Sequence, residues 1–336
     1  MKLSRLILLV FIMMMGLAGA ARAQEQEKSP AAKAQEQIQL WRYAAMHGDA
    51  AAQLDLGIAF HNGTMGVVQN YKEAFHWYQE AAQLGNAAAQ LGLGIAYQNG
   101  EGVAKNEEEA VKWYKKSADQ GNAAAQLNLG VAYHDGNGIV QNGAEAVTWW
   151  RKAADQGNAA AELGLGLAYY NGEGVEKDYK EAFKWYQAAA DQGNATAQFY
   201  LGAIYHGGEG TEKNDKEAIG WWKKAADQKE ASAQFCLGLA YHNGEGVEQN
   251  DKQSIVLWNK AAEQGNVSAQ LHLVVAYHKG EGVDKNDKEA LNWLNRSANH
   301  GKPDFECGGE KASNQQGEDA DSGNTAVQVI FGHAKQ

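Results

Sequence analysis

The sequence predicts an all-α fold, a right-handed α/α superhelical solenoid of about seven helical hairpins that are each about 36 residues long. Two observations predict it. All ten Trp residues fall in one half of a repeating segment. Gly-Asn pairs recur at multiples of 36 residues and begin at Gly85, Gly121, Gly157, Gly193 and Gly265. A fixed period of this length is typical of proteins built from stacked repeats.

Each repeat is expected to hold two amphipathic helices, as the second repeat shows. Apolar residues on one face of a helix recur every three or four positions. Residues 87–99 have this spacing at Ala89, Leu93, Ala96 and Tyr97. The second half of the repeat has it at Ala110, Trp113, Tyr114, Ser117 and Ala118. One hairpin cannot bury both apolar faces, so neighbours must stack, and Gly94 is expected to let the two helices approach closely.

The helix ends are also encoded. Asn106 followed by Glu109 forms a capping-box pattern, in which each side chain satisfies a free backbone amide. Gly121 is expected to end the second helix in the left-handed conformation. Lys229 stands where the other repeats have this glycine, so a strained or differently shaped turn is expected there. The capping pair recurs in all seven repeats, at Asn70, Asn106, Asn142, Asp178, Asn214, Asn250 and Asn286.

These boundaries divide the chain into four parts. Residues 1–23 are predicted to be a signal peptide, and 24–47 an N-terminal segment with a capping helix. Residues 48–300 hold seven repeats (48–84, 85–120, 121–156, 157–192, 193–228, 229–264 and 265–300). Residues 301–336 begin like an eighth repeat and continue as a polar, mostly disordered tail, in which the apolar run 327–331 is a candidate for docking on the last repeat.

The first residues have the secretory pattern. Lys2 and Arg5 precede an apolar run, and Ala21-Arg22-Ala23 is a cleavage site, so we expect export to the periplasm or the extracellular space after cleavage near Ala23. The run is shorter than the ~20 residues that span a bilayer. An uncleaved N-terminal anchor is the alternative. No other segment is apolar enough to enter a membrane.

Charge and cysteine content limit the possible partners. The formal net charge is −11, which disfavours nucleic acid and anionic lipid. Cys236 and Cys307 are the two cysteines. If the stack continues regularly they lie about two repeats apart, beyond the ~7 Å that a disulfide permits between Cα atoms. Cys236 is therefore expected to be buried in a helix and Cys307 to be free.

Two polar series invite a chemical interpretation. A histidine follows the aromatic residue near the end of the first helix at His61, His134, His206, His242 and His278. Stacked helices 8–10 Å apart would space the imidazoles too widely for one zinc ion, so a repeated polar rim is favoured over metal binding. The carboxylates of Glu101, Glu173, Glu209, Glu245 and Glu281 favour an acidic edge over acid–base catalysis. No catalytic, cofactor or metal site is predicted.

The repeat pattern resembles the Sel1-like repeat family, which is related to the tetratricopeptide repeats. In the second repeat, the shared residues are Ala89, Leu93, Gly94, Tyr97, Gly100, Gly102, Val103, Ala110, Trp113, Tyr114, Ala118 and Gly121. Ser254, Leu257 and Val274 depart from this pattern, so looser packing is expected in the last two repeats.

The resemblance implies a non-catalytic adaptor or scaffold that binds proteins or peptides. The candidate binding surface is Gln90, Gln98, Asn128, His134, Gln198, His206, His242 and His278. The alternative is a cell-wall-associated β-lactam-binding or β-lactamase-like enzyme, as in the cysteine-rich branch of the family. This chain lacks the cysteine pair that each repeat of that branch carries. A self-assembling structural repeat is the third possibility, and the oligomeric state stays open.

Overall fold

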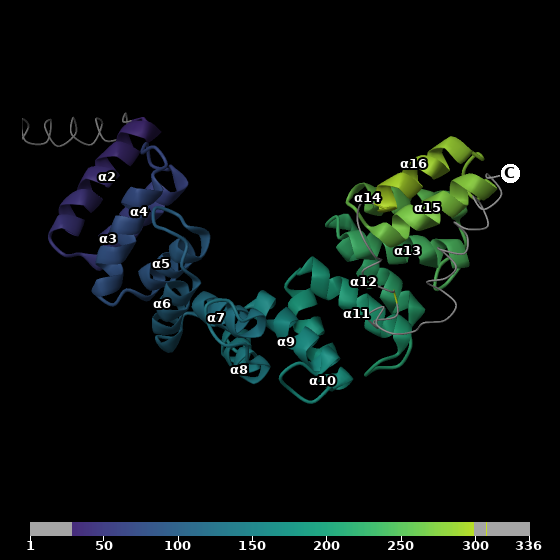
Figure 1. Cartoon of the computed structure of the whole chain (residues 1–336), viewed down its shortest axis with the longest axis horizontal. Helices are drawn as coiled ribbons and strands as arrows, with labels where there is room; N and C mark the ends of the chain where they lie inside the picture. The colour runs from purple at the N-terminus through teal and green to yellow at the C-terminus, as the bar shows by residue number, and fades with distance from the viewer. Residues whose placement is uncertain (1–28, 299–306, 308–336) are drawn as a thin grey trace, which may run out of the picture. The chain divides into compact units, whose positions relative to one another are not determined.

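A computed structural model describes residues 29–298 and residue 307. The predicted signal peptide (1–23) and the predicted tail after Cys307 lie outside these residues. Within them the chain forms fifteen helices and no strand, which confirms the all-α solenoid class (Figure 1). No helix among these residues is long and apolar enough to cross a membrane. The helices are α2 (Pro30–Met46), α3 (Ala50–Asn62), α4 (Tyr71–Gln83), α5 (Ala87–Asn99), α6 (Glu107–Asp119), α7 (Ala123–Asp135), α8 (Gly143–Ala154), α9 (Ala159–Asn171), α10 (Tyr179–Asp191), α11 (Ala195–Gly207), α12 (Asp215–Asp227), α13 (Ala231–Asn243), α14 (Asp251–Glu263), α15 (Val267–Lys279) and α16 (Asp287–Ala298).

The helices belong to two compact units that divide between Gln141 and Asn142. In the first unit α2 packs on α3, and each later helix packs on its predecessor as far as α7. The second unit follows the same rule from α8 to α16. Each compact unit is thus a tandem stack in which helices pack mainly on their sequence neighbours.

A glycine of the first helix lies under an aromatic ring of the second helix in most pairs. A Cβ atom added to Gly238 in α13 would lie 2.5 Å from the Trp258 ring of α14. Gly94 faces Tyr114 in the same way, and Tyr114 is only 2% exposed. That separation is well below carbon–carbon contact distance, so no side chain fits between the helices. The expected role of Gly94 is confirmed.

The second helices begin where the capping pattern predicts, but only half of the capping box forms. Asn106 Oδ1 accepts a hydrogen bond from the Glu109 N–H at 3.1 Å. The Asn106 N–H does not donate to the Glu109 side chain, because it donates to the Tyr97 carbonyl at 2.8 Å. Glu109 pairs with Lys112 instead. The backbone of the capping residue therefore ties the second helix to the first, and the same bond recurs at Asn70, Asp178, Asn214, Asn250 and Asn286.

The turn at Lys229 keeps the geometry that glycine has in the other repeats. Gly121 follows its helix at φ 89°, and Lys229 has φ 67°. The Lys229 N–H donates to the Ala226 carbonyl at 2.9 Å, as the Gly121 N–H does to that of Ala118. The predicted strain is confirmed, because a residue with a side chain is less stable in this conformation by about 1–2 kcal/mol.

The irregular residues of the last two repeats are well packed. Ser254, Leu257 and Val274 are all buried. Val274 replaces the glycine of the close contact, and the aromatic position opposite holds Leu294. The larger residue on one helix is matched by a smaller one on the other. The expectation of looser packing is wrong for these side chains.

The two cysteines form a disulfide, which corrects the expectation that Cys307 is free. Cys236 is buried in α13 as expected, and its Cα lies 5.5 Å from that of Cys307. The expectation assumed that residue 307 continues the stack in an eighth repeat. Cys307 instead packs against the core cluster that contains Trp258 and Cys236. The bond closes a loop with a sequence separation of 71 residues that includes α14, α15 and α16.

Breaking this disulfide should destabilise the protein substantially. A loop of this length restricts the unfolded chain, and the loop-entropy model assigns it up to about 4 kcal/mol. We expect the Cys307→Ser variant to unfold at a clearly lower urea concentration than the oxidised parent chain.

The reducing agent dithiothreitol supplies the control. It should lower the unfolding midpoint of the parent chain to that of the variant and leave the variant unchanged. Equal midpoints for the oxidised parent and the variant would contradict the assignment of this bond as a structural crosslink.

Candidate binding surface

Two of the predicted surface residues, Gln90 and Gln198, are buried, so their assignment to an open surface is wrong. Gln90 Nε2 donates to the Ala82 carbonyl at 3.3 Å, at the end of the preceding helix. Its Oε1 accepts from Gln120 Nε2 at 2.7 Å. Both polar groups of this amide are therefore used inside the stack. The same donation to a preceding helix end recurs at Gln53, Gln126, Gln198, Gln234 and Gln270.

Glu162 occupies this buried glutamine position in the fourth repeat. It accepts a hydrogen bond from Gln192 Nε2 at 2.7 Å. In the other repeats the glutamine donates an N–H to a helix-end carbonyl. A carboxylate has no N–H and cannot make this hydrogen bond. Burial raises the pKa of Glu162, and the hydrogen bond from Gln192 opposes that shift. The fold therefore carries one buried acid where its pattern calls for an amide.

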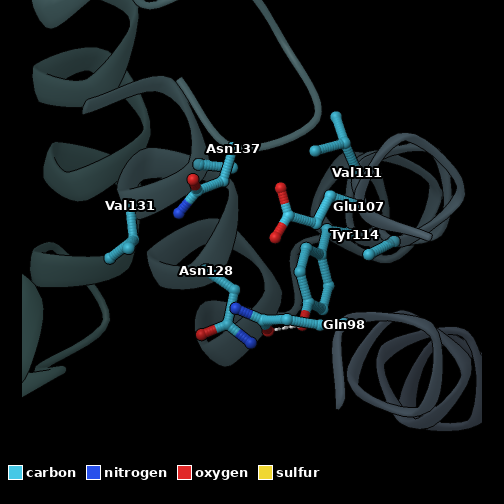
Figure 2. Close-up of a pocket in the computed structure, with 9 residues that line it drawn as sticks. Gln98, Glu107, Val111, Tyr114, Asn128, Val131 and Asn137 are labelled. Atoms are coloured by element: carbon cyan, nitrogen blue, oxygen red, sulfur yellow. Dashed lines mark hydrogen bonds between the residues drawn. The ribbon is translucent and has the colours of Figure 1, made fainter. Parts of the chain in front are cut away.

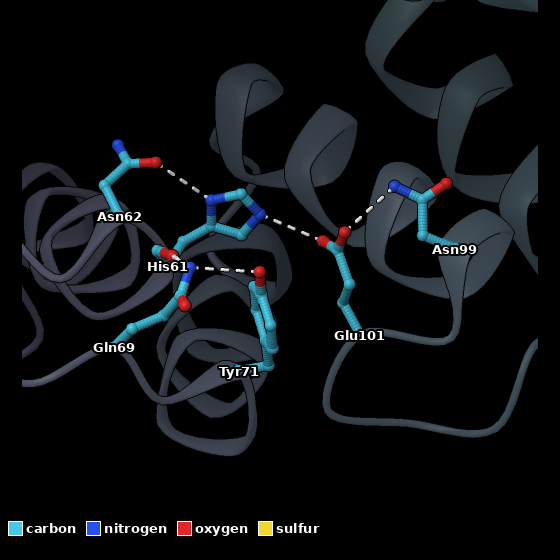
Figure 3. Close-up of polar contacts among 6 residues, drawn as sticks. All are labelled: His61, Asn62, Gln69, Tyr71, Asn99 and Glu101. Carbon is cyan, nitrogen blue, oxygen red and sulfur yellow. Dashed lines mark hydrogen bonds and ion pairs between the residues drawn. The ribbon is translucent and has the colours of Figure 1, made fainter.

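Histidines at the end of the first helix contact the loop of the following repeat. Figure 3 shows His61 between two partners. Its Nε2 lies 2.9 Å from Glu101 Oε2, and its Nδ1 lies 3.1 Å from Asn62 Oδ1. Burial lowers the pKa of His61, but the hydrogen bonds to Asn62 and Glu101 and the Glu101 charge outweigh it, so the pKa is raised. Asn99 donates to the other Glu101 oxygen at 3.0 Å and fixes the carboxylate.

The remaining predicted histidines pair with carboxylates in their own repeats. Nδ1 of His206 lies 2.8 Å from Asp215, at the start of the next helix. The same pairing joins His242 to Asp251 and His278 to Asp287. His134 Nδ1 lies 2.8 Å from Asp135 Oδ1. In the part of the chain that the structure describes, no cluster of three or more His, Cys, Asp or Glu is placed to hold a metal ion.

The other two predicted residues, Gln98 and Asn128, meet in a pocket of the first compact unit (Figure 2). Tyr114 joins them, because its hydroxyl donates to Gln98 Oε1 and is hydrogen-bonded to Asn128. Burial raises the pKa of this Tyr114 hydroxyl, and the bond to Asn128 opposes the shift. Glu107 and Asn137 complete the polar lining. The apolar wall consists of Ala110, Val111, Val131 and Ala132.

Sequence reasoning missed Glu107, Tyr114 and Asn137 as pocket residues. Tyr114 was assigned to the core, where its ring indeed lies. Asn137 carried a signal, because it interrupts the series of loop glutamates at 101, 173, 209, 245 and 281. That interruption becomes informative only when the glutamates are known to contact the preceding repeat. The pocket is thus one of the places where the repeat departs from its own pattern.

Comparison with known proteins agrees with this architecture. The family model described as Sel1 repeat matches seven consecutive segments that cover more than half of the chain, at residues 50–86, 87–122, 123–158, 159–194, 195–230, 231–266 and 267–302. No curated protein matches the chain.

Two solved structures are similar over most of this chain. A Sel1 repeat protein from Oxalobacter formigenes is 34% identical with a TM-score of 0.68, and the match covers 73% of this chain and 96% of that one. A protective antigen present in uropathogenic Escherichia coli strains, which displays an SLR fold, is 40% identical with a TM-score of 0.71. That match covers 78% of this chain and 56% of the other, so this chain spans little more than half the length of the E. coli protein.

The buried Glu162 should make stability depend on pH. The pKa of Glu162 is raised in the folded state, so the ionised carboxylate lowers the stability of the fold at pH values above the ordinary glutamate pKa. This loss of stability disappears as the pH falls below that value. At neutral pH we expect the Glu162→Gln variant to be more stable by about 1 kcal/mol, the usual net contribution of one hydrogen bond. Urea unfolding between pH 4 and pH 8 measures the difference.

The reverse change at an equivalent position is the matched control. Gln198→Glu should destabilise the protein at neutral pH and recover part of the loss in acid. A difference between Glu162→Gln and the parent chain that stays constant across this range would contradict the assigned cost of ionisation.

Proposed function

The chain belongs to the Sel1 repeat family, and from that premise we propose that it is an exported, non-catalytic scaffold that binds protein or peptide partners. Sel1 repeat proteins are typically protein-interaction scaffolds. One observation carries the proposal for this chain. The recurring polar residues are used in packing, whereas the residues around the pocket of Gln98, Asn128 and Asn137 vary between repeats and reach solvent. Variable polar groups on a regular frame suit recognition of a particular partner.

Two independent features support export. The first 23 residues have the n-region, apolar run and cleavage site of a secretory signal. The disulfide between Cys236 and Cys307 suits an oxidising compartment, because cytosolic thiols are kept reduced.

No observation favours the β-lactam-directed enzyme considered above. The disulfide within the described residues joins α13 to Cys307, so it does not close a single repeat as the cysteine pairs of that branch do.

Partner capture tests the scaffold function. The mature, oxidised chain, carrying an affinity tag, is crosslinked in envelope extracts of its own cell, and bound proteins are quantified by mass spectrometry. We expect at least one partner whose recovery saturates and is displaced by excess untagged chain. Circular dichroism checks that the bait is folded. Recovery of no competed partner by folded bait, or hydrolysis of a chromogenic β-lactam by the purified chain, would overturn the proposal.

A further inference from the structure

Helix α2 packs on α3 as the second helix of one repeat packs on the following repeat. The Gln53 side chain donates to the Ala45 carbonyl at the end of α2 at 3.1 Å, as Gln90 does to the Ala82 carbonyl at the end of α4. The glycine after α2 has φ 86°, and the glycine after α4 has φ 89°. Neither Gly-Asn nor Gly-Asp, the start of a first helix, precedes α2 in this sequence. α2 is therefore a second helix that no first helix precedes here.

In the complete repeats, the face of the second helix that covers the first helix is buried. In α6 this face holds Ala110, Tyr114 and Ser117. The Tyr114 ring covers Gly94, and the Ser117 hydroxyl donates to the Ala87 carbonyl at 2.6 Å. The equivalent residues of α4, α8, α10, α12 and α14 are also buried, and none is more than 7% exposed. A second helix without its first helix leaves this face open.

That face of α2 is open. Gln37, Trp41 and Ala44 stand at the equivalent positions, and none of them is buried. Leu40 is 58% exposed, whereas the tryptophan or Leu257 at its position in the other second helices is buried or half-buried. Gln37, Leu40, Trp41 and Ala44 form the open face of α2. An exposed face with large apolar residues is typical of an interaction site.

Helix α16 is open on the side where a following repeat would pack. Leu291 is 41% exposed, and Ala298 is exposed as well. At the position of Leu291, Ile38 of α2 packs in one cluster with Leu56 of α3. The same position is only 5–7% exposed in Val111, Val147, Ile219 and Ile255. Residue 307 would belong to the next first helix if the repeat continued, but the disulfide holds Cys307 on α13.

Residues 323–336 match the sequence of a first helix. They align without a gap on residues 85–98, which hold the Gly-Asn turn and the first helix of the second repeat. The matches include the helix cap, the buried glutamine and the glycine that an aromatic ring covers. Val327 and Phe331 keep the apolar face, and Lys335 replaces Tyr97. The segment lies outside the described residues, so the match is one of sequence. Seven positions are identical, namely Gly323, Asn324, Ala326, Gln328, Gly332, Ala334 and Gln336.

We propose that residues 323–336 of one copy form the first helix of an eighth repeat, whose second helix is α2 of a second copy. The inference goes beyond the proposed scaffold function. Gln328 donates to the Ala298 carbonyl at the end of α16, as Gln270 does one repeat earlier. Gly332 lies under Trp41 of the second copy, in the arrangement that most described helix pairs share. One segment thus covers the exposed residues of α16 and the open face of α2, and the copies join head to tail.

The chain is long enough to place the segment there. Cys307 is fixed on α13, and the eighth first helix lies four helices farther along the stack. Neighbouring helices are about 8–10 Å apart, so the distance is at most about 40 Å. Gly323 follows Cys307 by 16 residues, and a chain of that length extends over about 50 Å.

Sedimentation velocity of the oxidised chain without its predicted signal peptide (24–336) tests the assembly. We expect the average mass to rise with concentration, because a head-to-tail contact adds copies to an open chain or closes them into a ring. Gly332→Val places a side chain where the Trp41 ring packs and should weaken association about tenfold or more. Gly317→Val makes the same change before the matched segment and should leave association unchanged.

Leu40→Glu and Tyr43→Glu form the matched pair on α2. Leu40 belongs to the open face, so a charge buried there should weaken association about as strongly as Gly332→Val does. Tyr43 is 65% exposed on the same helix, but its position holds Lys116 and Lys224 in other repeats and lies outside the open face. Tyr43→Glu should therefore associate like the parent chain. Circular dichroism checks that all four variants are folded.

A mixture of the two interface variants tests the direction of the contact. Each variant keeps one intact end, so Leu40→Glu and Gly332→Val should each stay monomeric and should together form a dimer with one copy of each. A parent chain that is monomeric at every concentration would overturn the proposal, as would a mixture that stays monomeric while the parent associates.

Pairing of two α2 helices is a separate outcome that would also overturn the proposal. It would appear as equal effects of Leu40→Glu and Tyr43→Glu, with no effect of Gly332→Val. None of these results depends on capture of a partner from extracts, so the assembly can fail while the scaffold function stands, and the reverse.

Discussion

The close contact between a glycine and an aromatic ring, which most helix pairs contain, is the constraint on which the other features depend. Added Cβ atoms at Gly57, Gly202 and Gly238 would come within about 2.5 Å of the ring that covers them. Absence of a side chain lets the helices approach, and the ring fills the remaining space. The loop geometry follows, because helices this close can be joined by the Tyr97–Asn106 backbone bond and its equivalents.

Stacking then determines what happens to the polar residues. Buried glutamines such as Gln90 satisfy the carbonyls at the end of the preceding helix, since buried acceptors are costly when left without donors. Rim residues such as His61 contact the loop of the next repeat. A repeated residue is therefore mostly a structural one. In our proposal, recognition falls to positions where the pattern is broken, such as the pocket beside Gln98 and Asn137.

Much of the fold was predictable from the sequence, because periodicity reports directly on helix faces and helix ends. The roles of Gly94 and Lys229 followed from their place in the repeat. The burial of Gln90 did not, since periodicity shows that an amide recurs but not what it faces. The pairing of Cys307 was missed because no repeat pattern determines the path of the chain after α16. Gln98 and Asn128 were placed on the candidate surface, whereas Glu107 and Asn137 joined them only through the packing of successive repeats.

The close contact can be tested by copying the exchange that the last repeat already contains, where Val274 and Leu294 replace the glycine and the ring. The free energy of unfolding is measured for Gly94→Val, Tyr114→Leu and the double variant in a double-mutant cycle. Gly94→Val alone should destabilise the protein by about 1–3 kcal/mol or more, because that is the usual cost of overpacking. The double variant should recover a large part of that loss, with a favourable coupling above about 1 kcal/mol. Additive effects of the two substitutions would contradict the view that this contact sets the spacing of the helices.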